Sequence, residues 1–102
     1  MIKLTVLYNQ PADPAAFDAH YFGTHVALAD SLPGIRCNEV TKTTGTLDGS
    51  MPPYYLTAEL VFDDVDAMRS ALASPEGQAA AADVANFASA GVTMFTGEIA
   101  GR

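Results

Sequence analysis

Residues 13–34 read DPAAFDAHYFGTHVALADSLPG, and this stretch has the start, the stop and the spacing of one long helix. Asp13 can cap the first turn, and Pro14 suits the first helical position because its missing N–H would be unpaired there anyway. Pro33 and Gly34 end the helix. Residues at steps of three or four share one face of it: Phe17, Tyr21, His25, Leu28 and Leu32. An ionisable histidine therefore stands in the middle of a face that should pack against the core.

The segments around this helix predict an α+β fold. Alternation and β-branched residues predict four strands, over 2–8, 35–45, 54–62 and 92–99. Acidic first turns and the start signal Ser74-Pro75-Glu76 predict two more helices, over 63–74 and 76–88. The order β-α-β-β-α(α)-β is that of a ferredoxin-like fold, in which a four-stranded antiparallel sheet carries its helices on one face. We expect residues 1–102 to form a single domain.

The predicted sheet has a second face that one chain leaves bare. The side chains of 54–62 that should face the helices are Leu56, Ala58, Leu60 and Phe62. Those on the opposite face are Tyr55, Thr57, Glu59 and Val61. Because this opposite face is partly apolar, it needs a cover, and the simplest one is the same sheet of another chain. We therefore expect a homodimer in which two sheets, back to back, close an α/β barrel with the helices outside.

Two acidic residues, Glu39 and Glu59, stand in the middle of predicted strands. If they project into such a barrel, they either pair across the dimer or act as proton-transfer groups with a raised pKa. The alternative is an ordinary salt bridge to Arg36 or Lys42.

The charge balance indicates which classes of partner are not expected. The chain has 12 acidic and 5 basic residues, for a formal net charge of -7, and it lacks the clustered Lys and Arg that phosphate binding needs. Nucleic acid and anionic membrane surfaces are therefore not expected as partners. The sequence shows neither a signal peptide nor an apolar run long enough to span a membrane, so we expect a cytoplasmic protein.

A metal site is not expected either. The single cysteine, Cys37, cannot build a cysteine-based metal site or an intramolecular disulfide. The two histidines, His20 and His25, are five positions apart, which is roughly 140° around an α-helix. They should therefore point in different directions, with His20 in solvent and His25 on the core face.

The residues of the long helix resemble a known family. The pattern Phe17-x3-Tyr21-x3-His25-x2-Leu28, followed by Leu32-Pro33-Gly34, resembles the EthD family of the dimeric α/β-barrel superfamily. The segments IKLTVLY (2–8), SPEGQ (74–78) and ADVANFA (82–88) resemble it too, so the similarity covers essentially the whole chain. Ala27 departs from the family, whose members usually carry proline there, and this predicts a straighter helix past His25.

The resemblance implies a dimeric ferredoxin-like barrel and a role with small molecules. EthD-like proteins are named for an accessory role in degrading a branched alkyl ether alongside a cytochrome P450 system. Related barrels include cofactor-independent monooxygenases, lactone isomerases, and decarboxylases or cyclases that act on polyketide-like aromatics. A shared fold does not transfer any of these activities by itself.

The candidate site centres on His25. It acts either as a general acid/base or substrate hydrogen-bonder at the end of a pocket, or as a buried neutral imidazole with both nitrogens satisfied. Tyr21, one turn earlier, either orients the imidazole and binds a substrate oxygen, or is a core aromatic residue; Tyr8 could reach the same cleft. The remaining candidates for substrate binding, which could equally be core or dimer contacts, are Phe22, Tyr55, Phe87 and Met94.

Two classes of function therefore remain open from the sequence. The first is a small-molecule enzyme or accessory protein that acts, without a tightly bound cofactor, on a hydrophobic oxygen-bearing compound such as an ether, an aromatic or a polyketide-like molecule. The alternative is a non-catalytic binding or carrier module that uses the same pocket. An interaction protein whose barrel merely supports assembly is a third possibility.

Overall fold

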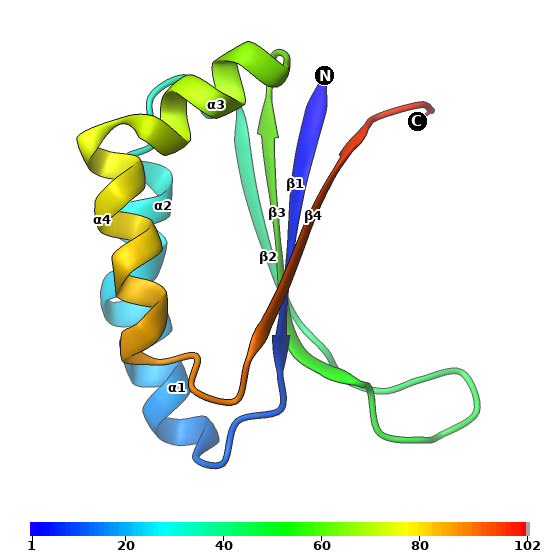
Figure 1. Cartoon of the computed structure of the whole chain (residues 1–102). Coiled ribbons are helices and arrows are strands. Elements are labelled where there is room, and N and C mark those ends of the chain that lie inside the picture. Colours follow the sequence, from blue (N-terminus) through cyan, green and yellow to red (C-terminus); the bar gives the residue numbers. More distant parts are fainter. Residues whose placement is uncertain (102) are drawn as a thin grey trace.

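The fold is one antiparallel sheet with all of its helices on one face, as the computed structural model of residues 1–101 shows (Figure 1). The sheet has the order β2-β3-β1-β4, and its strands are β1 (Ile2–Asn9), β2 (Cys37–Lys42), β3 (Tyr54–Phe62) and β4 (Val92–Glu98). The helices are α1 (Pro14–His20), the π-helical turn η1 (Tyr21–His25), α2 (Val26–Asp30), α3 (Val65–Ala73), α4 (Pro75–Asp83) and the 3-10 turn η2 (Val84–Asn86). The predicted ferredoxin-like α+β arrangement is confirmed.

The helix starts follow the predicted signals. The Asp13 side chain accepts a hydrogen bond from the backbone N–H of Ala16 at 3.1 Å, and Asp64 and Ser74 cap α3 and α4 in the same way. The ends differ most from the prediction in two elements. The second strand covers only Cys37–Lys42, and the last helix stops at Asp83 and continues as η2.

The long helix of residues 14–30 contains one wide turn. The backbone N–H of Val26 bonds to the carbonyl of Tyr21, five residues earlier, which is the pattern of a π-helix. Because this bond closes a turn over five residues, side chains five positions apart lie on the same side of the helix. The prediction that His20 and His25 point in different directions assumed α-helical geometry throughout, and it is wrong at this turn. Ala27 lies just past it, in regular α-helix.

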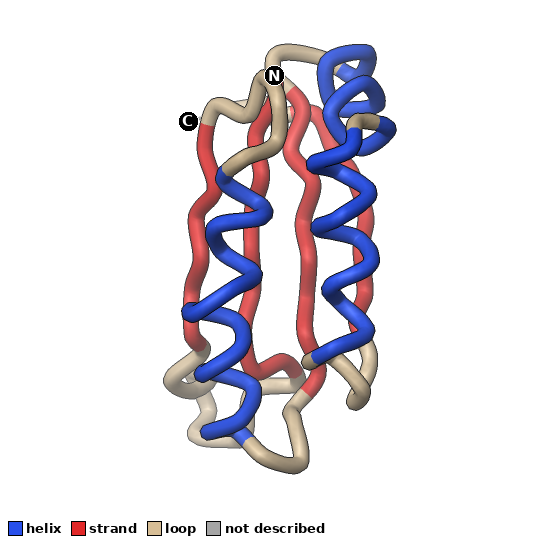
Figure 2. Tube along the Cα trace, turned by 90° about the vertical axis from the view of Figure 1, so that its left-hand side faces the viewer, coloured by secondary structure: helices blue, strands red, loops and turns tan. Residues whose placement is uncertain are grey.

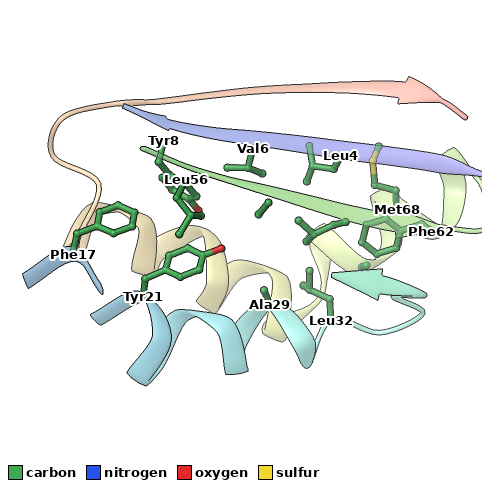
Figure 3. Packing of buried hydrophobic residues seen from close by; sticks show 13 residues of the cluster. Leu4, Val6, Tyr8, Phe17, Tyr21, Ala29, Leu32, Leu56, Phe62 and Met68 are labelled. Atoms are coloured by element: carbon green, nitrogen blue, oxygen red, sulfur yellow. The ribbon is translucent and has the colours of Figure 1, made fainter. Parts of the chain in front are cut away.

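The core lies between the helices and the sheet (Figure 3). Alternate residues of the two central strands supply one side of it, including Leu4, Val6 and Tyr8 of β1. Phe17 and Tyr21 supply the other side from the long helix. Each large apolar side chain that is fully buried contributes about 1.5–3 kcal/mol. Since these contacts fix the distance between helix and sheet, they also set the position of His25.

Within residues 1–101, the opposite face of the sheet carries no helix (Figures 1 and 2). Glu59 lies on it and pairs with Lys3 at 2.6 Å. The expected alternative partners are engaged elsewhere, because Arg36 bonds to Asp63 and Lys42 bonds to Asp18, each at 2.8 Å. The salt-bridge partners predicted for Glu59 were therefore wrong. Lys3 is two positions from Thr5, which lies opposite Glu59 on the neighbouring strand, so its side chain is on the same face.

Tyr55 does not follow the alternation predicted for its strand. The pairing of β1 with β3 shifts between Tyr8 and Asn9, so that Tyr55 is an extra residue, as in a β-bulge. Its ring packs against Phe17 at 5.3 Å between centroids, and its hydroxyl donates to Asp18 at 2.8 Å. Tyr55 therefore links α1 to the sheet through these two contacts.

Candidate functional site

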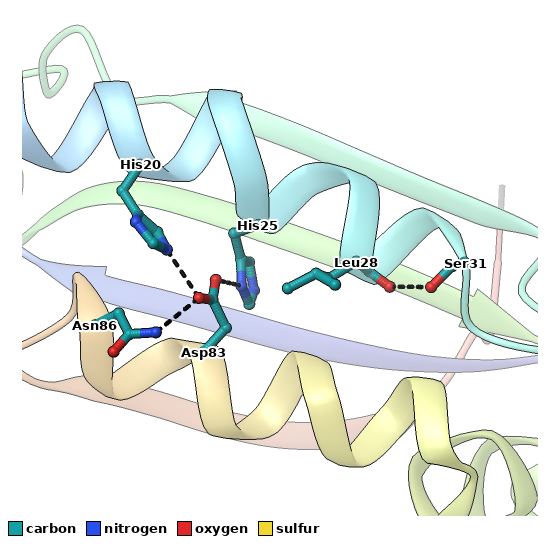
Figure 4. Close-up of polar contacts among 6 residues, drawn as sticks. All are labelled: His20, His25, Leu28, Ser31, Asp83 and Asn86. Carbon is teal, nitrogen blue, oxygen red and sulfur yellow. Dashed lines mark hydrogen bonds and ion pairs between the residues drawn. The ribbon is translucent and has the colours of Figure 1, made fainter.

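A buried carboxylate, Asp83, joins both histidines (Figure 4). Nδ1 of His25 lies 2.9 Å from one carboxylate oxygen, and Nε2 of His20 lies 2.8 Å from the other. The Asn86 amide donates to the same oxygen as His20, at 2.9 Å. The network connects the π-helical turn with the end of α4, two elements that run side by side (Figure 2).

His20 belongs to this network and does not simply point into solvent. Its side chain is 30% exposed, and its ring stacks on Phe87 with 5.4 Å between centroids. The wide turn at Tyr21–His25 is the cause, since it brings His20 onto the side of the helix that carries His25. The expectation of a solvent-facing His20 is therefore wrong.

The surroundings keep Asp83 ionised. Burial alone would raise the pKa of its carboxyl group, but the hydrogen bonds from Asn86, His20 and His25 favour the charged form and leave the pKa below its ordinary value. An ionised carboxylate can only accept hydrogen bonds. His25 must therefore donate from Nδ1–H, and in the neutral ring the lone pair then resides on Nε2.

His25 lines a pocket of about 90 Å³ between the helices and the sheet. One water molecule needs roughly 10–15 Å³ of such volume, so the pocket has room for a small ring or for part of a larger ligand. Its polar side chains are Tyr8, Tyr21, His25 and Asn38, and its other lining residues are apolar or glycine. Leu72, Ala81 and Met94 line it and are also exposed, which places the mouth between α4 and the edge strand β4.

Two phenols stand beside the imidazole in this pocket. The ring centroids of Tyr21 and His25 are 5.4 Å apart, and those of Tyr8 and Tyr21 are 5.5 Å apart. Burial raises the pKa of Tyr21 to about 12, with a smaller contribution from Asp30. Burial also raises the pKa of Tyr8, with smaller contributions from Tyr21 and Asp83. Both hydroxyls therefore stay protonated near neutral pH and can donate hydrogen bonds to a ligand oxygen.

Comparison with known proteins places this architecture in a family. Residues 9–91 match the EthD domain. The chain belongs to the EthD family. It is 52% identical over 99 residues to the "uncharacterized 11.0 kDa protein in thcB-thcC intergenic region" of Rhodococcus erythropolis, covering 96% of this chain and 95% of that one.

Solved structures agree with this placement. An EthD (ethyl tert-butyl ether) family protein from Bacillus halodurans matches with a TM-score of 0.92 and 39% identity, over 98% of this chain and 99% of the other. SnoaB, a cofactor-independent oxygenase from Streptomyces nogalater, matches with a TM-score of 0.73 and 19% identity, over 99% and 94%. A dimeric ferredoxin-like protein from Thermobifida fusca matches with a TM-score of 0.73 and 15% identity, over 96% and 90%. The last two similarities show a shared fold only.

The structure of this EthD protein gathers some of the candidate residues and leaves others apart. Tyr8, Tyr21, His25 and Met94 line one pocket. Phe87 packs behind the imidazole, with 4.7 Å between the ring centroids. Phe22 is 49% exposed and does not line this pocket. Tyr55 is held by α1 and does not line it either.

Sequence reasoning on this EthD chain missed Asp83 and Asn38. Asp83 lies in the ADVANFA segment that carried part of the family resemblance, and it follows an alanine-rich run. The available signal was a carboxylate and an amide three positions apart, Asp83 and Asn86, because these share one side of a helix. Nothing in the strand 37–42 marks Asn38 as a pocket residue, since neighbouring polar side chains surround it in the sequence.

Two further features concern metal ions and membranes. Within residues 1–101, no three His, Cys, Asp or Glu side chains are placed to hold a metal ion. In the same part of the chain, no helix has the length and apolar character needed to cross a bilayer.

Proposed function

We propose that this EthD protein is a small-molecule enzyme, or an accessory enzyme, in which His25 exchanges a proton with a hydrophobic oxygen-bearing compound. The observation that carries the proposal is the pairing of His25 with the ionised, buried Asp83 at the wall of an apolar pocket. A buried imidazole that was only structural would have both nitrogens engaged. In His25, which lines the pocket, Nδ1 is engaged by Asp83, and no hydrogen bond to Nε2 is found among residues 1–101.

The chemistry follows from the positions of the groups. Nε2 of His25 takes a proton from an O–H or an activated C–H of the substrate, and the electron pair of the broken bond stays on the substrate as enolate or phenolate charge. The Asp83 carboxylate stabilises the imidazolium that forms. Tyr21 and Tyr8 donate hydrogen bonds to the substrate oxygen, where negative charge develops. Return of the proton to another position of the substrate completes an isomerisation. In a cyclisation, the enolate carbon forms a bond to a carbonyl carbon of the same substrate, and the carbonyl oxygen receives the electron pair and then the proton. In the decarboxylation of a β-keto acid, the bond to the carboxylate carbon breaks, CO2 leaves, and the proton returns to the carbon that held it.

The test compares variants of the two paired residues. Purified protein is assayed against a panel of quinols, lactones and β-keto acids, the compound classes that present an acidic proton beside an oxygen. We expect His25→Ala to lose activity, and Asp83→Asn to retain a small part of it because the imidazole remains but its tautomer is no longer fixed. Full activity of His25→Ala on a compound that the wild type converts would refute the role of His25.

The same panel separates this function from a carrier module. A ligand that binds the wild type tightly and is never converted, with His25→Ala changing only its affinity, would favour the carrier.

We also propose that the protein acts as a homodimer built through the open face of the sheet. The Thermobifida fusca protein of the same fold is described as dimeric. The loop between β2 and β3 reaches past the open face (Figure 1). It carries Leu47, which is fully exposed, and Met51, which is 77% exposed. Asp48 accepts hydrogen bonds from Thr46 and Ser50 and so keeps this loop folded. A second copy on the open face would cover both apolar side chains.

A further inference from the structure

Asn38 of β2 lines the same pocket as His25 and contains a buried acceptor without a partner among residues 1–101. Its Nδ2 donates to Oδ1 of Asp30 at 3.0 Å, which fixes the orientation of the amide. Its Oδ1 is buried and has no hydrogen-bond partner among residues 1–101. A buried acceptor without a partner costs free energy. A ligand that donates a hydrogen bond to this oxygen would recover that free energy.

The acceptor lies at the opposite end of the pocket from the phenols. Asn38 pairs with Leu60, and Leu60 pairs with Leu4 of β1. Tyr8 is four residues further along β1, about 13 Å away at the usual rise of a strand. On the helix side, Asp30 is five residues beyond His25, about 7.5 Å along the axis. The side chains between the two ends are apolar and include Ala29 and Leu60.

We propose that the pocket selects an elongated, mostly apolar compound that carries a hydrogen-bond donor, a hydroxyl or an N–H, for Oδ1 of Asn38. This inference rests on the proposed function, because the reacting oxygen of the same compound is placed at His25 and the two phenols. The two polar ends of the compound are then roughly 7–8 Å apart, the axial distance between His25 and Asp30. A compound with an ether or carbonyl oxygen at the Asn38 end is disfavoured, since two acceptors would face each other.

Two probes that share one ring system test the assignment. Naphthalene-2,6-diol has the required length and a hydroxyl at each end, and 6-methoxy-2-naphthol replaces one hydroxyl with an acceptor. We expect the wild type to bind the diol about twofold to tenfold more tightly in calorimetric titration, which is the range that one neutral hydrogen bond supports. Asn38→Leu keeps the approximate size of the side chain and removes the acceptor, so it should bind the two probes equally. Thr41→Val, on the same strand but outside the pocket, should retain the preference.

The experiment also separates this inference from the proposed function. Affinity is measured in His25→Ala as well, where proton transfer is absent, and the preference for the diol should persist there. Equal affinity of the wild type for the two probes, or no binding of either, overturns the assignment of Asn38, whatever activity His25 shows on the other compounds. A preference that persists in Asn38→Leu also overturns it. Circular dichroism verifies that Asn38→Leu is folded. A folded Asn38→Leu that still prefers the diol counts against the assignment.

Discussion

Nδ1 of His25 lies 2.9 Å from Oδ2 of Asp83, although the two residues are 58 positions apart in the chain. This contact connects the π-helical turn between α1 and α2 to the last residue of α4. Because the carboxylate also bonds to His20 and Asn86, three hydrogen bonds end on one buried group. The same interaction therefore holds two helices together and selects the tautomer of the imidazole that faces the pocket.

Replacing Asp83 with asparagine should destabilise the protein. The amide keeps the shape of the side chain but loses the charge, and its NH2 group replaces one of the two oxygens and so faces the donor nitrogen of one histidine. We expect the free energy of unfolding to fall by about 1–3 kcal/mol, the usual cost of unmatched buried polar groups. Urea denaturation followed by circular dichroism measures the change. Asp66→Asn, an exposed acidic residue of α3, is the control and should change stability by less than about 0.5 kcal/mol.

The contribution of Asp83 should disappear in acid. The pKa of its carboxyl group is lowered in the folded protein by the net effect of burial, which opposes ionisation, and the three hydrogen bonds, which favour it. The stabilisation is therefore complete above the ordinary pKa of about 4 and is lost as the pH falls through the lower folded value. The difference in unfolding free energy between the wild type and Asp83→Asn should shrink below about pH 4. A difference that stays constant from neutral pH down to that range would contradict this account.

Tyr21 should make stability depend on alkaline pH. Burial raises the pKa of its phenol to about 12, so the folded state keeps a proton that the unfolded chain releases near pH 10. The stabilisation is present below about pH 10 and is lost as the pH rises through the folded value. Tyr21→Phe cannot ionise and should flatten the fall of the unfolding free energy between about pH 10 and 12. Denaturation curves at stepped pH, with tyrosinate absorbance recorded in parallel, measure both effects.

The fold was predictable because its signals are local. Asp13 and Pro14 mark a helix start whatever surrounds them, and the alternation from Leu56 to Phe62 marks a strand with one buried face. These signals are properties of neighbouring residues, so the order of the elements follows from them. The antiparallel ferredoxin-like sheet then follows from the order.

The site was only partly predictable because its signals are not local. His25 stood out as a polar residue on an apolar stripe, but its partner Asp83 comes from another helix. The wide turn that brings His20 to the same carboxylate is a backbone feature without a clear sequence signal. The bulge at Tyr55 likewise turned a side chain that simple alternation placed on the open face. In each case, a contact with a distant residue or a local irregularity of the backbone determined where the side chain points.

The proposed dimer can be tested on the open face of the sheet. Leu7 lies on the central strand β1, between Thr57 and Thr93 of the adjacent strands. Leu7→Glu would place a charge in the contact between the two sheets, where it cannot be solvated. We expect light scattering to give the dimer mass for the wild type and the monomer mass for Leu7→Glu. Ala79→Glu, on the exposed side of α4, should stay dimeric. A monomeric wild type at micromolar concentration would refute the proposed assembly.

Two glycines of the helical layer should respond in opposite ways to the same substitution. Gly77, in the first turn of α4, is buried, and a Cβ there would overlap the backbone carbonyl groups of Ala71 and Leu72 at the end of α3. Gly77→Ala should therefore force α3 and α4 apart and destabilise the protein by about 1–3 kcal/mol. Gly23, in the π-helical turn, is exposed, and a Cβ added there would meet no neighbouring segment within 4 Å. Gly23→Ala should be neutral or stabilising by up to about 1 kcal/mol, because it restricts the unfolded chain.

Thermal and urea denaturation of both variants measure this difference. Gly77 also lines the pocket, so displacement of α4 should weaken ligand binding in Gly77→Ala and leave it unchanged in Gly23→Ala. Equal stability of the two variants would show that α3 and α4 can move apart without a loss of unfolding free energy. In that case, the close approach of backbone at Gly77 would not be what holds α4 in place over the pocket.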